Sequence, residues 1–170
     1  PWAVSASEVR EEAAVNAPPD ESARNVAPAD LTRVYEDDRI RVSWYAGRCI
    51  HSGACIRALP AAFNPRNRPW VNLTAGDADA VAAAVERCPT GALEYVRLDG
   101  GPQEGAVEHP IVVPVRNGPL FVRGAVEVKD EQGRLIRRGT RVALCRCGRS
   151  AHLPFCDNTH RAIGFRTDRS

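Results

Sequence analysis

Three cysteines and one histidine lie close together near the C-terminus of the chain. They are Cys145, Cys147, Cys156 and His160, and their spacing is C-x-C, then eight residues, then C-x3-H. Thiolates and a neutral imidazole are the donors that soft and borderline metals prefer. By spacing alone, this set of four suits either an iron–sulfur cluster or a closed tetrahedral zinc site.

The same stretch resembles the CDGSH iron–sulfur family, whose pattern runs C-x-C-x2-[ST]-x3-P-x-C-D-G-[SAT]-H. The sequence keeps Ser150, Pro154 and Asp157, and it has Asn158 where the family usually has Gly. Asn tolerates a left-handed backbone better than most residues, so the turn can survive this change. The resemblance implies that Pro154 stiffens the loop and that Asp157 supplies hydrogen bonds around the ligands. It also implies a 2Fe–2S cluster held by Cys145, Cys147, Cys156 and His160.

The other three cysteines, Cys49, Cys55 and Cys88, form a second set. Bacterial ferredoxins carry C-x2-C-x2-C early in their motif and a Cys-Pro at its end. Here Cys49 and Cys55 occupy the first and third early positions, and Ser52 occupies the second. Cys88, which a proline follows, supplies the late position. Gly53 lets the backbone turn tightly, with amide groups aimed at the sulfurs of a cluster.

Residues 40–96 therefore resemble the divergent single-cluster ferredoxins, including their Cys-Ile-His-Ser-Gly and Arg-Pro-Trp segments. The sequence departs from the four-cysteine pattern at Ser52. Three thiolates suit a 3Fe–4S cluster, which is the expected cofactor, whereas a 4Fe–4S cluster would need Ser52, His51 or an outside molecule as its fourth ligand. The Cys-Pro-Thr-Gly-Ala-Leu ending argues against ordinary buried thiols. Trp44 and Trp70 are predicted to be core residues.

Short strands and one helix are expected to position the two sets of donors. Residues 39–45 alternate as in a strand, and a capping pair, Thr74 and Asp77, precedes a helix near residues 77–87. Asn117 and the glycine after it predict a hairpin turn. The other expected strands cover residues 111–115, 120–128 and 140–144. The predicted fold class is α+β, with a ferredoxin-like N-terminal unit and a small β-rich CDGSH-type unit.

Four segments are predicted along the chain. They are a loosely structured arm (1–30), a ferredoxin-like cluster domain (31–98), a linker (99–110) and a CDGSH-type 2Fe–2S domain (111–170). Proline and acidic residues are frequent in the arm, where a short helix is expected from about Ser5 to Ala14. Glycine and proline break any regular structure in the linker.

The charge of the chain is small but unevenly placed. Net charge is +2, yet residues 1–38 hold nine acidic and three basic side chains, and residues 131–170 hold three acidic and nine basic ones. We expect the basic end either to attract an acidic redox partner, rather than nucleic acid, or to be a solvated face that offsets the charge of a cluster. The arginines around the first two ligands are Arg137, Arg138, Arg141, Arg146 and Arg149.

Two expected iron–sulfur sites predict an electron carrier rather than an enzyme. The sequence has no dinucleotide fingerprint and no nucleophile-plus-base arrangement. The expected partners are a flavin-dependent reductase and an acceptor oxidoreductase. A homodimer is a candidate assembly, because many members of the CDGSH family dimerise. A redox- or pH-responsive sensor, a cluster donor and a structural metalloprotein stay open as alternatives.

The expected compartment is the cytoplasm. The sequence shows no long apolar run and no export leader, and the cysteine spacings are those of metal ligands rather than of a disulfide scaffold. No membrane partner is therefore expected.

Overall fold

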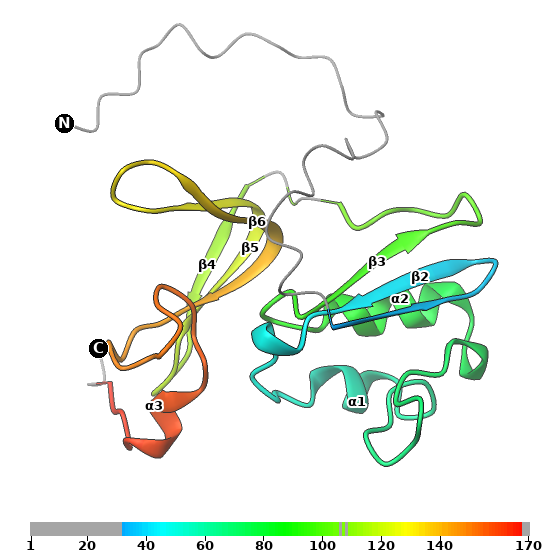
Figure 1. Ribbon diagram of the computed structural model, residues 1–170, viewed down its shortest axis with the longest axis horizontal. Helices are drawn as coiled ribbons and strands as arrows, with labels where there is room; N and C mark the ends of the chain where they lie inside the picture. Colours follow the sequence, from blue (N-terminus) through cyan, green and yellow to red (C-terminus); the bar gives the residue numbers. More distant parts are fainter. Residues whose placement is uncertain (1–31, 106, 108, 168–170) are drawn as a thin grey trace, which may run out of the picture.

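Two small antiparallel sheets with short helices form the molecule (Figure 1). The computed structural model describes residues 32–105, 107 and 109–167. The first sheet contains β1 (Arg33–Glu36), β2 (Ile40–Trp44) and β3 (Leu93–Arg97), and the second contains β4 (Ile111–Pro114), β5 (Leu120–Lys129) and β6 (Leu135–Leu144). This mixture agrees with the predicted α+β class. The predicted arm and its helix lie outside the described residues.

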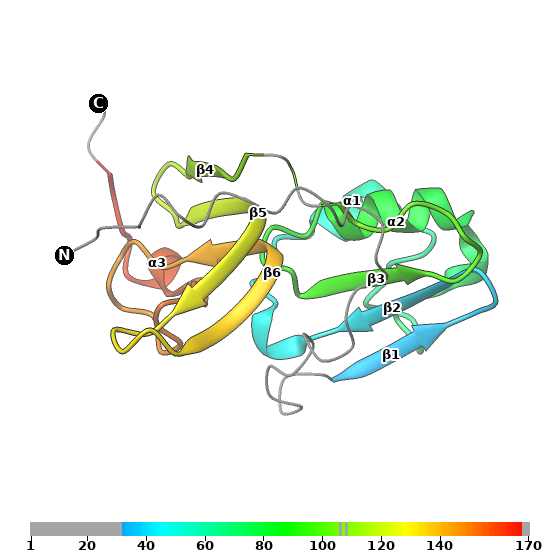
Figure 2. The same cartoon turned by 90° about the horizontal axis from the view of Figure 1, so that it is seen from above.

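The N-terminal unit (residues 32–105) contains the main hydrophobic core. Helix α2 (Ala78–Glu86) begins where the Asp77 carboxylate accepts the backbone N–H of Ala80 at 2.7 Å, so the expected helix is present with Asp77 as its cap. Figure 2 shows α2 beside β3, with α1 (Ala54–Ala58) next to it. The largest fully buried side chains here are Phe63, Ile40, Leu93, Val42, Val71, Val81 and Val85.

The C-terminal unit (residues 109–167) has a much thinner core. Its buried apolar residues are Val122, Val142, Ala143 and Cys156. On β4, by contrast, Ile111, Val112 and Val113 are each at least half exposed. So small an apolar core supplies little stability of its own, and units of this kind usually depend on a metal or a docked neighbour.

A buried arginine on β6 docks the two units together. The Arg141 side chain is only 2% exposed, and its guanidinium donates to the carbonyl oxygens of Cys88 at 2.9 Å and Leu93 at 2.8 Å. The same guanidinium pairs with the Glu104 carboxylate at 2.7 Å. Glu104 lies in the predicted linker, so this segment supplies the counter-ion of the docking arginine.

Close backbone approach completes this contact. Gly91 has φ +62°, and a Cβ there would lie 2.8 Å from the Arg141 carbonyl oxygen, so glycine is required both by the conformation and by the space. Arg137 donates to the Thr90 carbonyl oxygen and lies over the ring of Phe155, 5.1 Å from its centroid. The loop that follows Cys88 therefore packs directly against β6.

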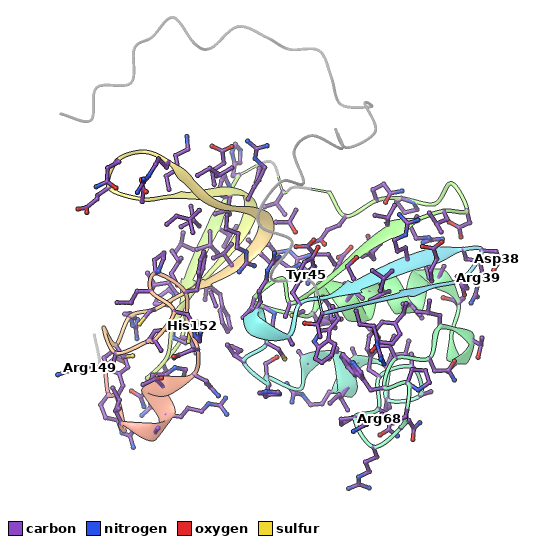
Figure 3. All side chains as sticks on the ribbon, viewed as in Figure 1. Asp38, Arg39, Tyr45, Arg68, Arg149 and His152 are labelled. Atoms are coloured by element: carbon purple, nitrogen blue, oxygen red, sulfur yellow. The ribbon has the colours of Figure 1, made fainter. Side chains whose placement is uncertain are left out.

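These contacts correct the prediction for two of the five arginines of the basic end, whereas Arg138 and Arg149 are exposed as predicted. Arg137 and Arg141 are buried, so they neither face solvent nor attract a partner. The Arg146 guanidinium donates to the Val115 carbonyl oxygen at 2.9 Å, and Arg138 pairs with Glu127. Arg149 remains exposed, and Figure 3 shows its side chain pointing away from the fold. The sequence could not reveal this, because the acceptors are mostly backbone carbonyl groups far away along the chain.

Among the described residues, no helix combines the length and apolar character needed to cross a bilayer.

Candidate metal centres

The first candidate centre is a small pocket in the N-terminal unit, where three segments of the chain meet. Cys49 follows the 3-10 helix η3 (Ala46–Arg48), Cys55 lies on α1, and Cys88 comes shortly after α2. All three cysteines line the same pocket. The other lining residues are Trp44, Ile50, Ser52, Gly53, Trp70, Thr90, Ala92 and Leu93.

Two thiols of this pocket, those of Cys49 and Cys55, are in an environment that disfavours their charge. Burial raises the pKa of Cys49, and the nearby charge of Cys88 adds to the rise. For Cys55, burial, together with the charges of Cys88 and Cys49, raises the pKa to about 11. Three thiolates held this close need a compensating cation, and metal binding supplies one as it releases the protons.

Ser52 and His51 occupy different positions around the pocket. Ser52 lines it beside the cysteines, whereas His51 is exposed and is not among the lining residues. The His51 Nδ1 atom lies 3.9 Å from the Cys49 sulfur. Gly53 has φ 69° immediately before α1, as the tight turn requires. Of the two candidate fourth ligands within the chain, Ser52 therefore lines the pocket, and His51 lies outside it beside Cys49.

Trp70 presents a buried N–H group beside these cysteines. Its ring packs against Trp44, with centroids 5.1 Å apart, and against Phe63 and Tyr35, as expected of a core residue. Its Nε1 atom is nevertheless buried with no hydrogen-bond partner among the described residues. A buried indole N–H usually has an acceptor. A cluster sulfur in the pocket would supply that acceptor, so the residues present fit such a group.

The second candidate centre lies where β6 ends. The Cys145 amide donates to the Pro154 carbonyl oxygen at 2.8 Å, and the Cys156 amide donates to the Ala143 carbonyl oxygen at 2.9 Å. The returning segment is therefore paired with the end of β6, which places Cys156 beside Cys145. His160 lies on the short helix α3 (Thr159–Ala162) and is buried.

The four donors of this centre fall into two pairs. The sulfurs of Cys145 and Cys147 are 3.7 Å apart, and the Cys156 sulfur is 3.5 Å from His160 Nδ1. A tetrahedral metal with bonds of ~2.3 Å to sulfur holds two such ligands about 3.8 Å apart. No three Cys, His, Asp or Glu side chains of the described residues form a group suited to one metal ion. Each pair therefore has the spacing of two ligands on one metal ion, as each iron of a two-iron cluster requires.

Three of the four donors of this centre have a shifted pKa, and the shifts of Cys145 and His160 favour their metal-binding forms. Burial opposes ionisation of Cys145, but backbone amides and the Cys147 thiol outweigh it and lower the pKa. Burial, followed by the charge of Arg161, lowers the pKa of His160, which keeps the imidazole in its neutral, metal-binding form. Burial raises the pKa of Cys156, with a further contribution from the charge of Cys145.

Asp157 and Asn158 shape the turn between Cys156 and α3. The Asp157 carboxylate accepts the amides of Ala151 at 2.8 Å and Thr159 at 2.9 Å. Hydrogen bonds from the Thr159 side chain and these amides hold the pKa of Asp157 well below its usual range. Asn158 has φ 78°, the left-handed conformation expected where the CDGSH pattern has Gly.

Comparison with known proteins gives a family match for each of the two units. Residues 35–98 match the family model described as "Divergent 4Fe-4S mono-cluster", and residues 117–161 match "Iron-binding zinc finger CDGSH type". "Uncharacterized protein YjdI" of Escherichia coli (strain K12) is 35% identical over 63 residues, which are 37% of this chain and 83% of that protein. The protein of the same description from Escherichia coli O157:H7 matches equally well.

The chain belongs to the divergent 4Fe-4S mono-cluster family, with a CDGSH domain fused to it. Both resemblances that the sequence predicted are thereby confirmed, and the chain is an iron–sulfur protein. The N-terminal unit is called the mono-cluster domain below, and the C-terminal unit is called the CDGSH domain.

Two residues beside the cysteines of the mono-cluster domain were missed as site residues. The Thr90 hydroxyl is buried, 3.6 Å from the Cys88 sulfur, and Trp70 was predicted only as core. The sequence motifs could have indicated both residues, because Thr90 directly follows the Cys-Pro pair and Trp70 ends the Arg-Pro-Trp segment. Both are polar groups in motifs that otherwise position sulfur ligands.

Replacing Trp70 by Phe is expected to lower the reduction potential of the mono-cluster centre. The change keeps most of the ring packing but removes the N–H group, and hydrogen bonds to cluster sulfurs favour the reduced state. One such bond contributes about 1 kcal/mol, which is roughly 40 mV for a one-electron couple. Potentiometric titration of both variants measures the shift. An equal shift in Trp44→Phe, at a neighbouring ring, would show that the Trp70 N–H group is not responsible.

Removing the metal is expected to unfold the CDGSH domain before the mono-cluster domain. The CDGSH domain buries few apolar side chains, whereas the mono-cluster domain has a continuous core. Metal binding to a small unit of this kind contributes directly to its folding free energy. Hydrogen exchange of the metal-free chain checks this. The backbone amides of β5 and β6 should lose their protection from exchange, whereas those of α2 should keep it. Equal loss of protection in both domains would contradict the expectation.

Proposed function

We propose that this chain is an electron carrier that accepts single electrons from a flavin-dependent reductase and delivers them to an acceptor oxidoreductase. The observation that supports this most is the direct contact between the segments that carry the two donor sets. Strand β6 leads into Cys145, and on the same strand Arg141 donates to the Cys88 carbonyl oxygen at 2.9 Å. An iron–sulfur cluster takes up or releases one electron, so two neighbouring clusters suit one-electron transfer.

The ligands in this proposal follow the observed groupings. Cys145 and Cys147 hold one iron of a 2Fe–2S cluster, and Cys156 and His160 hold the other. Cys49, Cys55 and Cys88 hold the cluster of the mono-cluster domain. The distances within the two pairs and the shared pocket of the three cysteines support these assignments.

The nuclearity of the first cluster depends on Ser52. Three cysteine ligands support a 3Fe–4S form, whereas the family is described as 4Fe-4S. Ser52 lines the pocket, which supports it as the ligand that would complete a four-iron form. If the cluster is 3Fe–4S, Ser52→Ala leaves its iron content unchanged, while Ser52→Cys converts it to a four-iron cluster. Loss of iron from Ser52→Ala would instead show that Ser52 is a ligand.

Low-temperature EPR of anaerobically purified protein tests the carrier proposal, with iron and sulfide assayed on the same sample. A 3Fe–4S signal as isolated, followed by a reduced 2Fe–2S signal after dithionite, is the expected result. Reduction by a flavin-dependent reductase should then proceed reversibly. Iron and sulfide sufficient for one cluster alone would contradict a two-cluster carrier.

One observation favours a second candidate function, a pH-responsive sensor or cluster donor. Cys156 shares its pair with an imidazole rather than a fourth thiolate, and protons compete with metals for imidazole. Cluster release to an apo-acceptor that is faster than reduction would support this function. Reduction faster than release would support the carrier.

A further inference from the structure

We propose that Asn158 bridges the two metal centres and carries the coupling along which an electron passes between them. This inference rests on the proposed two-cluster carrier and names the residue that would connect its centres. The Asn158 side-chain amide donates to the Ile50 carbonyl oxygen at 3.3 Å. Ile50 directly follows Cys49, so this one hydrogen bond reaches from the ligand turn of the CDGSH domain to the ligand loop of the mono-cluster domain.

The other end of Asn158 contacts the second centre. Its backbone amide lies 3.4 Å from the Cys156 sulfur, in hydrogen-bonding geometry. A single residue therefore donates to a sulfur ligand through its backbone and to the opposite ligand loop through its side chain. The resulting path runs from Cys156 through Asn158 to Ile50 and Cys49, with no further residue between the domains.

A second interdomain connection is longer. Arg141 donates to the Cys88 carbonyl oxygen, but four residue positions along β6 separate it from Cys145. That path crosses a guanidinium ion whose other donors bind Glu104 and the Leu93 carbonyl oxygen. Arg141 therefore fixes the docking of the domains, and Asn158 provides the shorter connection between ligands.

Stability alone does not account for asparagine at position 158. Its Oδ1 atom is buried with no hydrogen-bond partner among the described residues. A buried acceptor left unpaired costs about as much free energy as a neutral hydrogen bond contributes, so the two effects largely cancel. A glycine would adopt φ 78° with less strain than asparagine does. The side chain offers a contact between the domains with little net gain in stability.

The proposed step moves one electron and nothing else. The centre held by Cys49, Cys55 and Cys88 is oxidised by one electron, and the centre held by Cys145, Cys147, Cys156 and His160 is reduced by one. No bond in the chain forms or breaks, and no proton is transferred. The flavin-dependent reductase supplies the electron, and a photoreductant replaces that enzyme in the test.

The test uses Asn158→Gly in the full, cluster-loaded chain, because glycine keeps the left-handed turn and removes only the side chain. After flash reduction, optical spectroscopy follows the arrival of the electron at the CDGSH centre. We expect the transfer rate to fall, while both reduction potentials and the iron content stay unchanged. The magnetic broadening between the two reduced centres in EPR should stay unchanged, because dipolar coupling depends on their separation and not on the side chain between them.

Arg123→Ala is the matched control. Arg123 contacts Glu86 across the same interface, with 3.2 Å between its guanidinium and the carboxylate, but it lies outside the path through Asn158. Its transfer rate should match that of the wild type. An unchanged electron-transfer rate in Asn158→Gly, or an equal fall in Arg123→Ala, would contradict the proposed role of Asn158. Either result would leave the carrier proposal intact. Absence of any transfer in the wild type would overturn both.

Discussion

Replacing Arg141 by Met is expected to destabilise the chain by about 3–5 kcal/mol, the usual effect of removing one partner of a buried ion pair. The substitution keeps an apolar side chain of similar length but leaves the Glu104 carboxylate, which is 10% exposed, without its counter-ion. The carbonyl oxygens of Cys88 and Leu93 also lose a donor. Urea unfolding of the cluster-loaded protein measures the change, and the two domains should then unfold in separate transitions.

Two further variants show whether docking causes this loss. Arg123→Met removes an ion pair with Glu86 whose side chains are 46% and 35% exposed, and an exposed pair of this kind contributes less than about 1 kcal/mol. The double variant Arg141→Met with Glu104→Leu removes both buried charges and should recover part of the stability. If Arg141→Met destabilised the chain no more than Arg123→Met, the buried pair would not be what docks the domains.

The close approach within the two donor pairs of the CDGSH domain could be predicted from the sequence because each pair is local. Cys145 and Cys147 are two residues apart, and Cys156 and His160 are four apart, so short turns bring each pair together. The hairpin of the CDGSH domain was equally local: the strands predicted at 111–115 and 120–128 correspond to β4 and β5. In each case the residues that come together are joined by one short turn of the chain.

Other elements were too short or too irregular to predict. Strand β1 has four residues and helix α1 has five, too few to show a period of alternation or of a helical face. Strand β6 begins at Leu135, five residues before the predicted start, because its first half carries arginines that broke the apolar pattern. Those polar side chains are satisfied by partners elsewhere in the fold, such as Glu127 for Arg138.

The interdomain contacts could not be predicted for a related reason. Arg141 binds carbonyl oxygens 48 and 53 residues away, and backbone carbonyl groups carry no signal in a sequence. Asn158 was recognised as a departure from the CDGSH pattern, but its contact with Ile50, 108 residues away, depends on how the domains dock. Function in a two-centre protein depends on this docking as well as on the ligand motifs.

The cluster of the CDGSH domain is expected to be lost on mild acidification, and His160→Cys is expected to prevent this loss. Burial, followed by the charge of Arg161, lowers the pKa of His160 from 6.5 in the fold. Because the folded value lies below the unfolded one, the stability linked to this group is present above about pH 6.5 and is lost as the pH falls. Since the neutral imidazole is the metal-binding form, metal affinity falls in the same direction.

The rate of bleaching in the visible spectrum measures this effect for each variant between about pH 7 and 5, on either side of the usual pKa of histidine. One competing proton should raise the rate by roughly tenfold per pH unit in the wild type. A cysteine at position 160 offers a thiolate that mild acid displaces less readily from iron, so the pH dependence should flatten. The mono-cluster centre is the internal control, because the three cysteines proposed to hold it include no histidine. Identical acid bleaching in His160→Cys and the wild type would show that His160 is not the labile ligand and would remove the main support for a pH-responsive sensor.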